Sequence, residues 1–168
     1  MSDIKRHFDE FHPGLIKELR AVAMGEALVI APGDLRLVAL ALKKDLGFDM
    51  LIDIAAVDFK GKSEPRFEVD YFFYNLARKT RAHIKVPVAS SDKPEVDSIT
   101  DLYPAANWAE REIWDMMGII VNGHPNLRRI LMWTGFEGHP LRKDYPINKR
   151  QPIPVLDANL IPERGKFS

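Results

Sequence analysis

The segment from residue 107 to residue 146 constrains the fold more than any other part of the chain, because glycine and proline interrupt it repeatedly. It begins with a helical pattern. Asn107 suits the N-cap position, and Glu110 stands three residues later, where its carboxylate can reach back to the cap. Gly118 suits the left-handed residue that ends a helix. The mixture of charged and bulky apolar side chains between these ends predicts a helix that faces two different environments.

Two Gly-His-Pro triplets follow this helix, at residues 123–125 and 138–140. Proline restricts the preceding histidine to extended backbone, and glycine frees the residue before it. Basic residues come shortly after each triplet, so we expect two stiff turns that hold an imidazole and a guanidinium in place. The apolar pieces at 119–121 and 130–133 are long enough only for short strands or buried loop anchors.

The first 145 residues predict an α+β domain, with helices packed on a mostly antiparallel or mixed sheet. The three strands expected between residues 50 and 88 follow one another through short loops, which favours antiparallel neighbours. The strand at 50–57 is apolar almost throughout, which predicts a central position with both faces covered. The expected elements are helices over 4–19 (interrupted at Pro13 and Gly14), 35–46 and 96–103, and strands over 27–30, 50–57, 67–76 and 81–88.

Residues 146–168 are predicted to form an extended C-terminal arm. Prolines are spaced through this stretch and prevent it from forming a helix or a core of its own. A disordered terminus is the alternative, but the segment contains more aliphatic residues than disorder usually tolerates. We therefore predict an arm that lies on a partner. The prolines concerned are Pro146, Pro152, Pro154 and Pro162.

Composition argues against several classes of function. The 24 basic residues balance 24 acidic ones, so the chain lacks the excess positive charge that favours nucleic acid or an anionic membrane. Without cysteine, the chain can form no disulfide, thiolate nucleophile or thiolate-ligated iron–sulfur cluster. The sequence contains no apolar run long enough to span a membrane, and its polar N-terminus lacks the apolar core of a secretory signal. We therefore expect a cytoplasmic protein.

A pair of carboxylates is the first candidate for chemistry. Glu112 and Asp115 stand three residues apart, so they share a helix face and could act as acid and base. The alternative is a structural role in which they pair with Arg128 or Arg129. The structural role is favoured, because no nucleophile motif and no phosphate-binding fingerprint accompanies the pair.

A metal site is the second candidate. His124 and His139, with one of Glu110, Glu112 or Asp115, would make a set of two histidines and one carboxylate. The two histidines lie on separate loops, however, and the basic residues beside them would repel a cation. Structural or interface histidines are therefore favoured.

Indole and guanidinium groups in this segment favour a protein interface instead. Tryptophan, methionine and arginine are enriched where protein surfaces meet. Arginine–carboxylate pairs that are sheltered from water also suit a permanent interface between two chains. The residues concerned are Trp108, Trp114, Trp133, Arg111, Arg128 and Arg129.

This set of residues resembles the signature of the 30-kilodalton subunit of respiratory complex I, a family that is represented in the bacterial NADH:quinone oxidoreductase by its C subunit. The resemblance rests on the residues Glu110–Ile119, both Gly-His-Pro triplets, Arg129–Leu131 and Leu141–Pro146, and it extends more loosely from about Leu15 onward. Met117 and Val121 depart from the family pattern, which commonly has an aromatic residue at the first position and phenylalanine at the second.

The resemblance implies a subunit of the peripheral arm that carries no cofactor, with FMN and iron–sulfur clusters in partner subunits. The implied partners are the hydrogenase-like large subunit at the quinone site, the small subunit with the terminal iron–sulfur cluster, and other peripheral-arm subunits. Such a subunit scaffolds the module that passes electrons from NADH to quinone, a reaction coupled to ion translocation. It lies on the cytoplasmic side of the inner membrane and contacts the membrane only indirectly.

The same resemblance implies structural and interface roles, with no catalytic, cofactor-binding or metal-binding residue in this chain. Two alternatives remain. One is the equivalent subunit of a membrane-bound hydrogenase-type complex, and the other is a free-standing metal hydrolase built on His124 and His139. The implied signature residues are Glu110, Arg111, Glu112, Trp114, Asp115, Gly118, His124, Pro125, Arg129, His139, Pro140, Arg142, Lys143 and Asp144.

Overall fold

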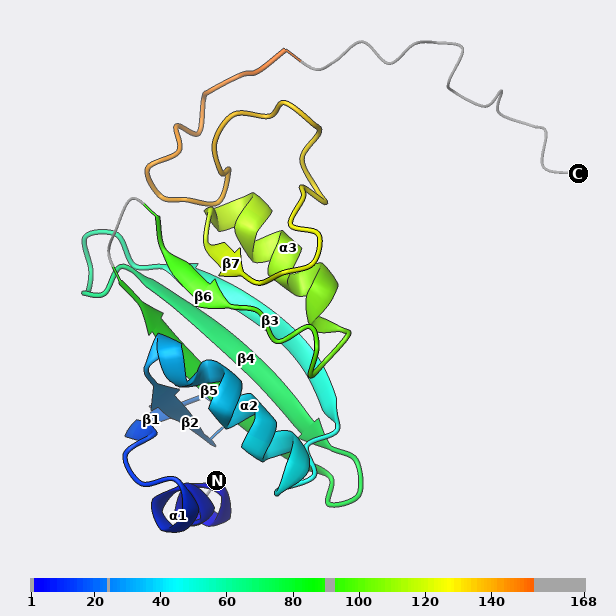
Figure 1. The fold of residues 1–168 in the computed structure, drawn as a ribbon. Coiled ribbons are helices and arrows are strands. Elements are labelled where there is room, and N and C mark those ends of the chain that lie inside the picture. The colour runs from blue at the N-terminus through cyan, green and yellow to red at the C-terminus, as the bar shows by residue number, and fades with distance from the viewer. Residues whose placement is uncertain (1, 24, 90–92, 153–168) are drawn as a thin grey trace, which may run out of the picture.

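The computed structural model describes residues 2–23, 25–89 and 93–152. A five-stranded mixed sheet with the order β1-β2-β5-β4-β3 forms its centre (Figure 1). All neighbouring strands are antiparallel except β2 and β5, which are parallel over a short register. The predicted α+β fold is therefore confirmed. The strands are β1 (Ile16–Val22), β2 (Gly25–Ile30), β3 (Met50–Asp58), β4 (Phe67–Asn75) and β5 (Thr80–Val88).

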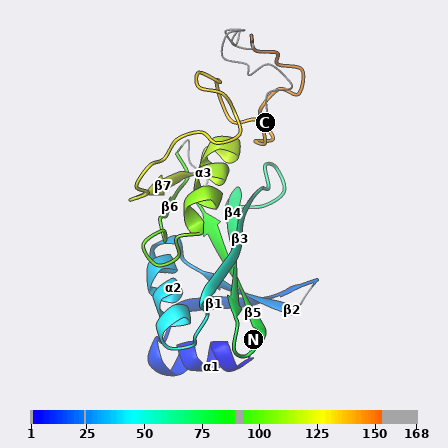
Figure 2. The ribbon, with the colours of Figure 1, turned by 90° about the vertical axis from the view of Figure 1, so that its right-hand side faces the viewer.

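Helices and a second, two-stranded sheet complete the fold. The strands β6 (Glu95–Asp97) and β7 (Ile120–Asn122) pair in parallel. The helix α1 lies at one end of the molecule, whereas α3 and the loop that follows it lie at the other end (Figures 1 and 2). The helical elements are α1 (Ser2–Phe11), η1 (Pro32–Asp34), α2 (Leu35–Lys44) and α3 (Ala106–Met117).

The core lies between α2 and the face of the sheet that α2 covers. Alternate residues of a strand point to the same face, and a row of such residues in β4 is completely buried: Phe67, Val69, Tyr71 and Phe73. The helix α2 contributes Leu35, Val38, Ala39 and Leu42 to the same cluster. Each large apolar side chain buried in this way contributes roughly 1.5–3 kcal/mol, so this contact fixes α2 on the sheet.

The opposite face of β4 carries a network of charges. The Nζ of Lys85 on β5 donates hydrogen bonds to Glu68 Oε1 at 2.6 Å and to Asp70 Oδ1 at 2.8 Å. Arg20 also bonds Glu68, from the β1–β2 hairpin, which projects on the side of the sheet away from α2 (Figure 2). Burial acts to raise the pKa of Asp70, but the hydrogen bonds from His83 and Lys85 outweigh it and hold this pKa below its usual value. Pairing of this kind allows charges to remain nearly buried on a sheet face.

The predicted antiparallel row β3–β4–β5 is confirmed, but the predicted central position of β3 is wrong. This strand forms an edge of the sheet. Leu51 and Ile54 are buried, whereas Met50 and Ile52 are each 46% exposed. The helix α3 packs against β3, and this cover accounts for the apolar sequence without a further strand on the outer edge.

Two predicted helices are wrong in part or entirely. Residues 16–22 form β1 instead of continuing the first helix, because the chain turns at Gly14 (φ +86°) and then pairs with β2. Residues 96–103 form the end of β6 and turns, with no helix. Residues 16–22 pair with β2, the next strand along the chain, and residues 95–97 pair with β7, which lies farther along. Strand pairing therefore overrides the local apolar spacing in both places.

Of the predicted arm, only residues 146–152 are described, and residues 153–168 lie outside the described part of the chain. Gln151 donates hydrogen bonds to the carbonyl oxygen of Glu137 and to the hydroxyl of Tyr145, each at 2.8 Å. Within the described ranges, no helix is both long enough and apolar enough to cross a membrane.

Candidate functional site

We call residues 107–146 the signature segment. Its helix α3 presents two different faces, as the sequence predicts: Glu110 and Asp115 have no exposed surface, while Trp108 is 64% exposed. Gly118 ends the helix with φ +72°, and its N–H donates to the carbonyl oxygen of Trp114 at 2.8 Å. The predicted helix end is therefore confirmed.

The predicted N-cap is wrong. The cap residue is Ala105, and no side chain caps the helix. The backbone N–H groups of Ala106 and Asn107 donate instead to the carbonyl oxygens of Tyr103 and Pro104, so the preceding turn satisfies the start of the helix.

The carboxylate of Asp115 organises the loop that follows β7. Its Oδ2 accepts hydrogen bonds from three consecutive backbone N–H groups, those of Ile130, Leu131 and Met132, at 2.9–3.0 Å. Its Oδ1 accepts one from Arg129 at 2.5 Å. Burial acts to raise the pKa of Asp115, but these hydrogen bonds outweigh it and lower the pKa. Asp115 is therefore a structural anion. Of the two predicted partners, Arg128 and Arg129, it pairs with Arg129, and this pair lies within the chain.

The guanidinium of Arg129 joins α3 to the second half of the loop. Its Nη2 donates to the carbonyl oxygens of Phe136 at 2.7 Å and Gly138 at 3.0 Å. It also lies 5.6 Å from the ring centre of Trp114 and 5.5 Å from that of Phe136. A planar group with several donors suits this position, because it bonds a carboxylate and two carbonyls while stacking between rings.

The second Gly-His-Pro triplet packs directly on the end of α3. The Nδ1 of His139 lies 3.0 Å from the carbonyl oxygen of Asp115, so this nitrogen carries the proton and donates it. A Cβ atom added at Gly118 would lie 2.5 Å from Cδ2 of His139. Glycine is therefore required at position 118 both by the backbone angle and by the close approach of the imidazole.

The first triplet holds His124 in a similar way. Its Nδ1 accepts a hydrogen bond from the N–H of Asn126 at 3.0 Å, so its Nε2 carries the proton and faces the carbonyl oxygen of Asn107 at 3.1 Å. In the described part of the chain, neither His124 nor His139 belongs to a group of convergent metal-ligating side chains. Both imidazoles form hydrogen bonds with backbone groups, which is the geometry expected of structural histidines.

Arg111 and Glu110 extend the network to both sides of α3. Arg111 donates to the carbonyl oxygens of Arg128 at 3.1 Å and Arg129 at 3.2 Å, so it holds the same loop as Asp115. Glu110 accepts hydrogen bonds from the Ser98 hydroxyl at 2.7 Å and the Ile99 N–H at 2.8 Å. Burial of this carboxyl raises the pKa of Glu110 to about 7, because these two donors compensate only part of the lost hydration.

The end of the signature segment returns to the main sheet. Arg66 bonds both Asp58 at the end of β3 and Asp144 in the loop, at 2.7–3.0 Å. The hydrogen bonds from Arg66 outweigh the effect of burial and lower the pKa of both carboxyls, that of Asp144 to about 2. Arg142 adds a contact to Asp144 at 3.3 Å. The sequence did not predict the role of Arg66, because this residue lies in a polar loop that precedes β4.

Several side chains of the segment face outward. The exposed residues include Glu112, Pro125 and Lys143, and Pro140 is partly exposed. Asp115 is buried, so the two carboxylates of α3 lie in different environments. A groove of about 180 Å³ runs between β3 and α3, with Asp53, Glu112, Met117 and Leu141 in its lining. The large apolar side chains exposed in this part of the molecule are Trp108, Leu131, Leu141 and Ile147.

The fold belongs to a class of protein that is represented in a respiratory membrane complex. The structure is similar to a chain of the membrane-bound sulfane sulfur reductase, an archaeal respiratory membrane complex. Identity is 25%, with a TM-score of 0.69 over 88% of this chain and 86% of that one. It is also similar to the trypsin-resistant fragment 1–134 of Nqo5, at 28% identity and a TM-score of 0.63 over 74% of this chain and 98% of the fragment.

Sequence comparison identifies the family. Residues 28–151 match the family described as the 30 Kd subunit of the respiratory-chain NADH dehydrogenase, and the chain belongs to this family. The NADH-quinone oxidoreductase C subunit of Geotalea uraniireducens is 45% identical over 134 residues, which are 79% of this chain and 77% of that protein. The corresponding protein of Geobacter metallireducens is 46% identical over 106 residues, or 63% of this chain. That match spans 65% of the length of the Geobacter protein.

Proposed function

We propose that this chain is a non-catalytic subunit in the peripheral arm of an NADH-quinone oxidoreductase, where it scaffolds the quinone-reducing module. The observation that carries the proposal is the use of the signature residues within the chain. Asp115, Arg129, Arg111 and His139 bond the loop to α3, and these bonds hold large apolar side chains at the surface. Exposed apolar groups on a rigid frame are typical of a binding surface.

The partners in this proposal are the hydrogenase-like large subunit at the quinone site and the small subunit with the terminal iron–sulfur cluster. Relatives of this chain are named as subunits of NADH-quinone oxidoreductase, which supports such an assembly. In this proposal the chain holds no cofactor, and FMN and the iron–sulfur clusters are bound by partner subunits. The complex passes electrons from NADH to quinone with coupled ion translocation, and this subunit lies on the cytoplasmic side of the inner membrane.

Co-purification of the native complex tests the proposal. Leu131 lies on the loop that Asp115 organises, and Leu37 lies on α2, and their exposed fractions are nearly equal at 56% and 55%. We expect Leu131→Lys to reduce the recovery of partner subunits, because it places a charge in a buried contact. Leu37→Lys should leave the recovery unchanged. Normal assembly of the Leu131→Lys complex would contradict an interface at this loop, and normal assembly combined with lost quinone reduction would indicate a catalytic role instead.

A second candidate is the equivalent subunit of another membrane-bound complex, such as one related to hydrogenases. The similarity to a chain of the sulfane sulfur reductase complex over 88% of this chain supports it. The proteins that co-purify with the native chain decide between the two. An NADH-oxidising flavoprotein favours the first proposal, and a complex without NADH oxidation favours the second.

A further inference from the structure

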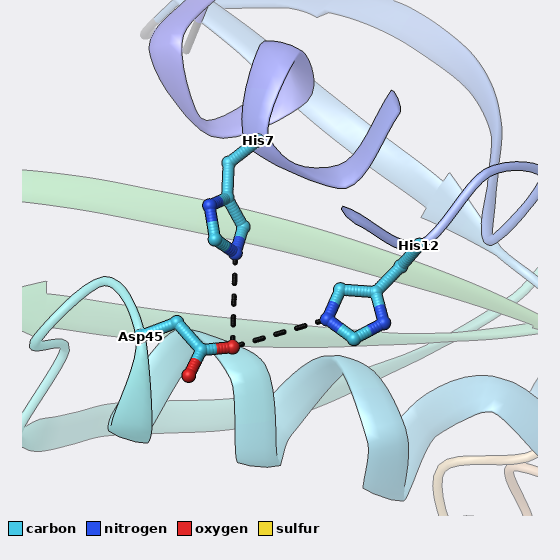
Figure 3. Close-up of side chains that lie close together, drawn as sticks. All are labelled: His7, His12 and Asp45. Carbon is cyan, nitrogen blue, oxygen red and sulfur yellow. Dashed lines mark ion pairs between the residues drawn. The ribbon is translucent and has the colours of Figure 1, made fainter. Parts of the chain in front are cut away.

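Two histidines and a carboxylate converge at the end of the molecule opposite the signature segment. His7 lies on α1, His12 lies directly after α1, and Asp45 follows the last residue of α2 (Figure 3). The Nε2 atoms of His7 and His12 lie 3.7 and 3.8 Å from the same oxygen, Oδ2 of Asp45. All three donor atoms lie within 4.8 Å of one another.

The polar atoms in this cluster lack direct hydrogen bonds to one another. The Nε2 of His7 is shielded from solvent and has no hydrogen-bond partner among the described atoms. A charged imidazole bonded directly to a carboxylate would approach it to about 2.7–2.9 Å, well inside the separations found here. An unpaired, shielded nitrogen beside a carboxylate costs free energy unless a third group joins them. An additional atom between the two imidazole nitrogens and the carboxylate oxygen would therefore stabilise the cluster.

A divalent metal ion fits this requirement. Two zinc ligands at about 2.0–2.1 Å in a tetrahedral site lie about 3.3–3.5 Å apart. The two distances from imidazole nitrogen to carboxylate oxygen, 3.7 and 3.8 Å, must therefore close by roughly 0.2–0.5 Å. The distance between the two imidazole nitrogens, which is at most 4.8 Å, must close by no more than about 1.5 Å. His12 and Asp45 have side chains that are 36% and 45% exposed, which leaves them free to make this movement. Imidazole and carboxylate ligands suit Zn²⁺, and sets of three protein ligands are common for this ion.

We propose that Zn²⁺ binds to His7 Nε2, His12 Nε2 and Asp45 Oδ2, and that it fastens α1 to the end of α2. The fourth position is open to water. The ion adds a second attachment for α1, which otherwise contacts the core through Ile4 and Phe8. Both histidines precede residues 28–151, the part of the chain that matches the family, so the family pattern does not itself specify this site.

Zinc titration of the full-length chain, made without a histidine tag and stripped with a chelator, tests the site. We expect one zinc ion per chain by calorimetry, and an increase in the thermal midpoint of unfolding when zinc is saturating. Asp45→Asn and His12→Gln should each weaken zinc binding by roughly tenfold or more, because each removes a ligand of a three-ligand site. The increase in the thermal midpoint should fall with the affinity.

Two control variants match these changes. Asp9 lies on α1, and its side chain is 52% exposed, comparable with the 45% of Asp45. Asp9→Asn therefore tests whether zinc is attracted nonspecifically by negative charge. His124→Gln removes a histidine that bonds backbone groups elsewhere. Both controls should bind zinc as the unaltered chain does. The proposal is overturned if zinc fails to saturate the chain below about 100 µM, or if Asp45→Asn and His12→Gln bind it with unchanged affinity.

Discussion

The carboxylate of Asp58 accepts a hydrogen bond from the backbone N–H of Lys143 at 2.8 Å, although 85 positions separate the two residues. Asp58 ends β3, and Lys143 lies near the end of the signature segment. This bond, together with Arg66 and Asp144, closes the loop onto the main sheet. Asp115 thus holds residues 129–132 of the segment on α3, and Asp58 holds the end of the segment on the main sheet.

Replacement of Asp58 should release the end of the loop. Asp58→Ala removes the carboxylate that pairs with Arg66, and we expect a loss of about 2–3 kcal/mol in the free energy of unfolding. The amide of Lys143 should also exchange with deuterium faster. Asp53→Ala on the same strand is the control, because Asp53 is exposed and bonds only the N–H of its neighbour Ile54 among the contacts described. Equal effects of the two substitutions on the Lys143 amide would contradict the role of Asp58.

Replacement of Asp115 should have the largest effect on stability. Asp115→Ala leaves the Arg129 guanidinium and three backbone N–H groups without their acceptor, and we expect a cost of about 3–5 kcal/mol. Glu112→Ala lies on the exposed side of the same helix and should change the free energy of unfolding by less than about 0.5 kcal/mol. Chemical denaturation of the purified chain measures both values. A small effect of Asp115→Ala would show that the loop is held by other contacts.

Gly118→Ala should be costly for two separable reasons. Gly123 has a nearly equal backbone angle (φ +76° against +72°), but no atom lies within 4 Å of the Cβ that alanine would add there. Gly123→Ala therefore measures the cost of the left-handed backbone alone, about 1–2 kcal/mol. Gly118→Ala adds the clash with His139, and we expect about 1–3 kcal/mol more.

The clash predicts that the effects of substitutions at Gly118 and His139 on the free energy of unfolding are not additive. In a background with His139→Ala, Gly118→Ala should cost less than it does in the unaltered chain, because the imidazole no longer occupies the space. Simple additivity of the two substitutions, measured by denaturation, would place the origin of the cost in the backbone angle alone.

Stability should decrease as pH rises through the range in which Glu110 ionises. The folded-state pKa of this carboxyl is about 7, above its unfolded value of 4.5. Between these values the folded chain binds more protons than the unfolded chain, so a rise in pH favours unfolding, by about 3 kcal/mol over the whole range. The carboxyls of Asp58 and Asp144 have lowered pKa values, so their contributions are lost only as the pH falls below 3.8.

Glu110→Gln isolates this effect. The amide cannot ionise, so the difference in unfolding free energy between Glu110→Gln and the unaltered chain should change by the same amount between pH 4.5 and pH 7. Urea denaturation at several pH values measures it. A difference that stays constant with pH would show that Glu110 ionises normally in the folded chain.

Truncation tests the predicted C-terminal arm. A chain that ends after Pro152 keeps the bonds of Gln151 to Glu137 and Tyr145, so we expect it to fold with unchanged stability. If residues 153–168 lie on a partner, the truncated chain should recover less of the large subunit when it is purified from the membrane. Undiminished recovery would contradict the predicted arm.

Local patterns predicted the elements whose causes are local. Gly118 ends α3 because glycine readily adopts the left-handed backbone that the end of this helix requires. The strands β3, β4 and β5 are neighbours because short loops connect them. The position of β3 at an edge could not be predicted in this way, since an apolar strand can be covered by another strand or by a helix such as α3. The strands β1 and β6 likewise depend on pairing that the spacing of their own residues does not reveal.

The chemistry of the site was predictable in part. The sequence favoured a structural role in which Glu112 and Asp115 pair with Arg128 or Arg129, and the structure contains one of these pairs, Asp115 with Arg129, inside the chain. Glu110 was predicted to reach back to the helix cap, but it bonds Ser98 and Ile99, because the turn before α3 already satisfies the first amides. A partner that lies in another part of the chain leaves no mark on the local sequence.

The hydrogen bonds from three backbone amides to Asp115 affect how strongly this chain can bind a partner. A loop that becomes ordered only on contact would lose conformational entropy at that moment, and affinity would fall accordingly. Here folding of the chain has already fixed the shape of residues 130–132. A partner that docks on this loop meets a surface prepared in advance, and more of the contact energy remains available to hold the two chains together.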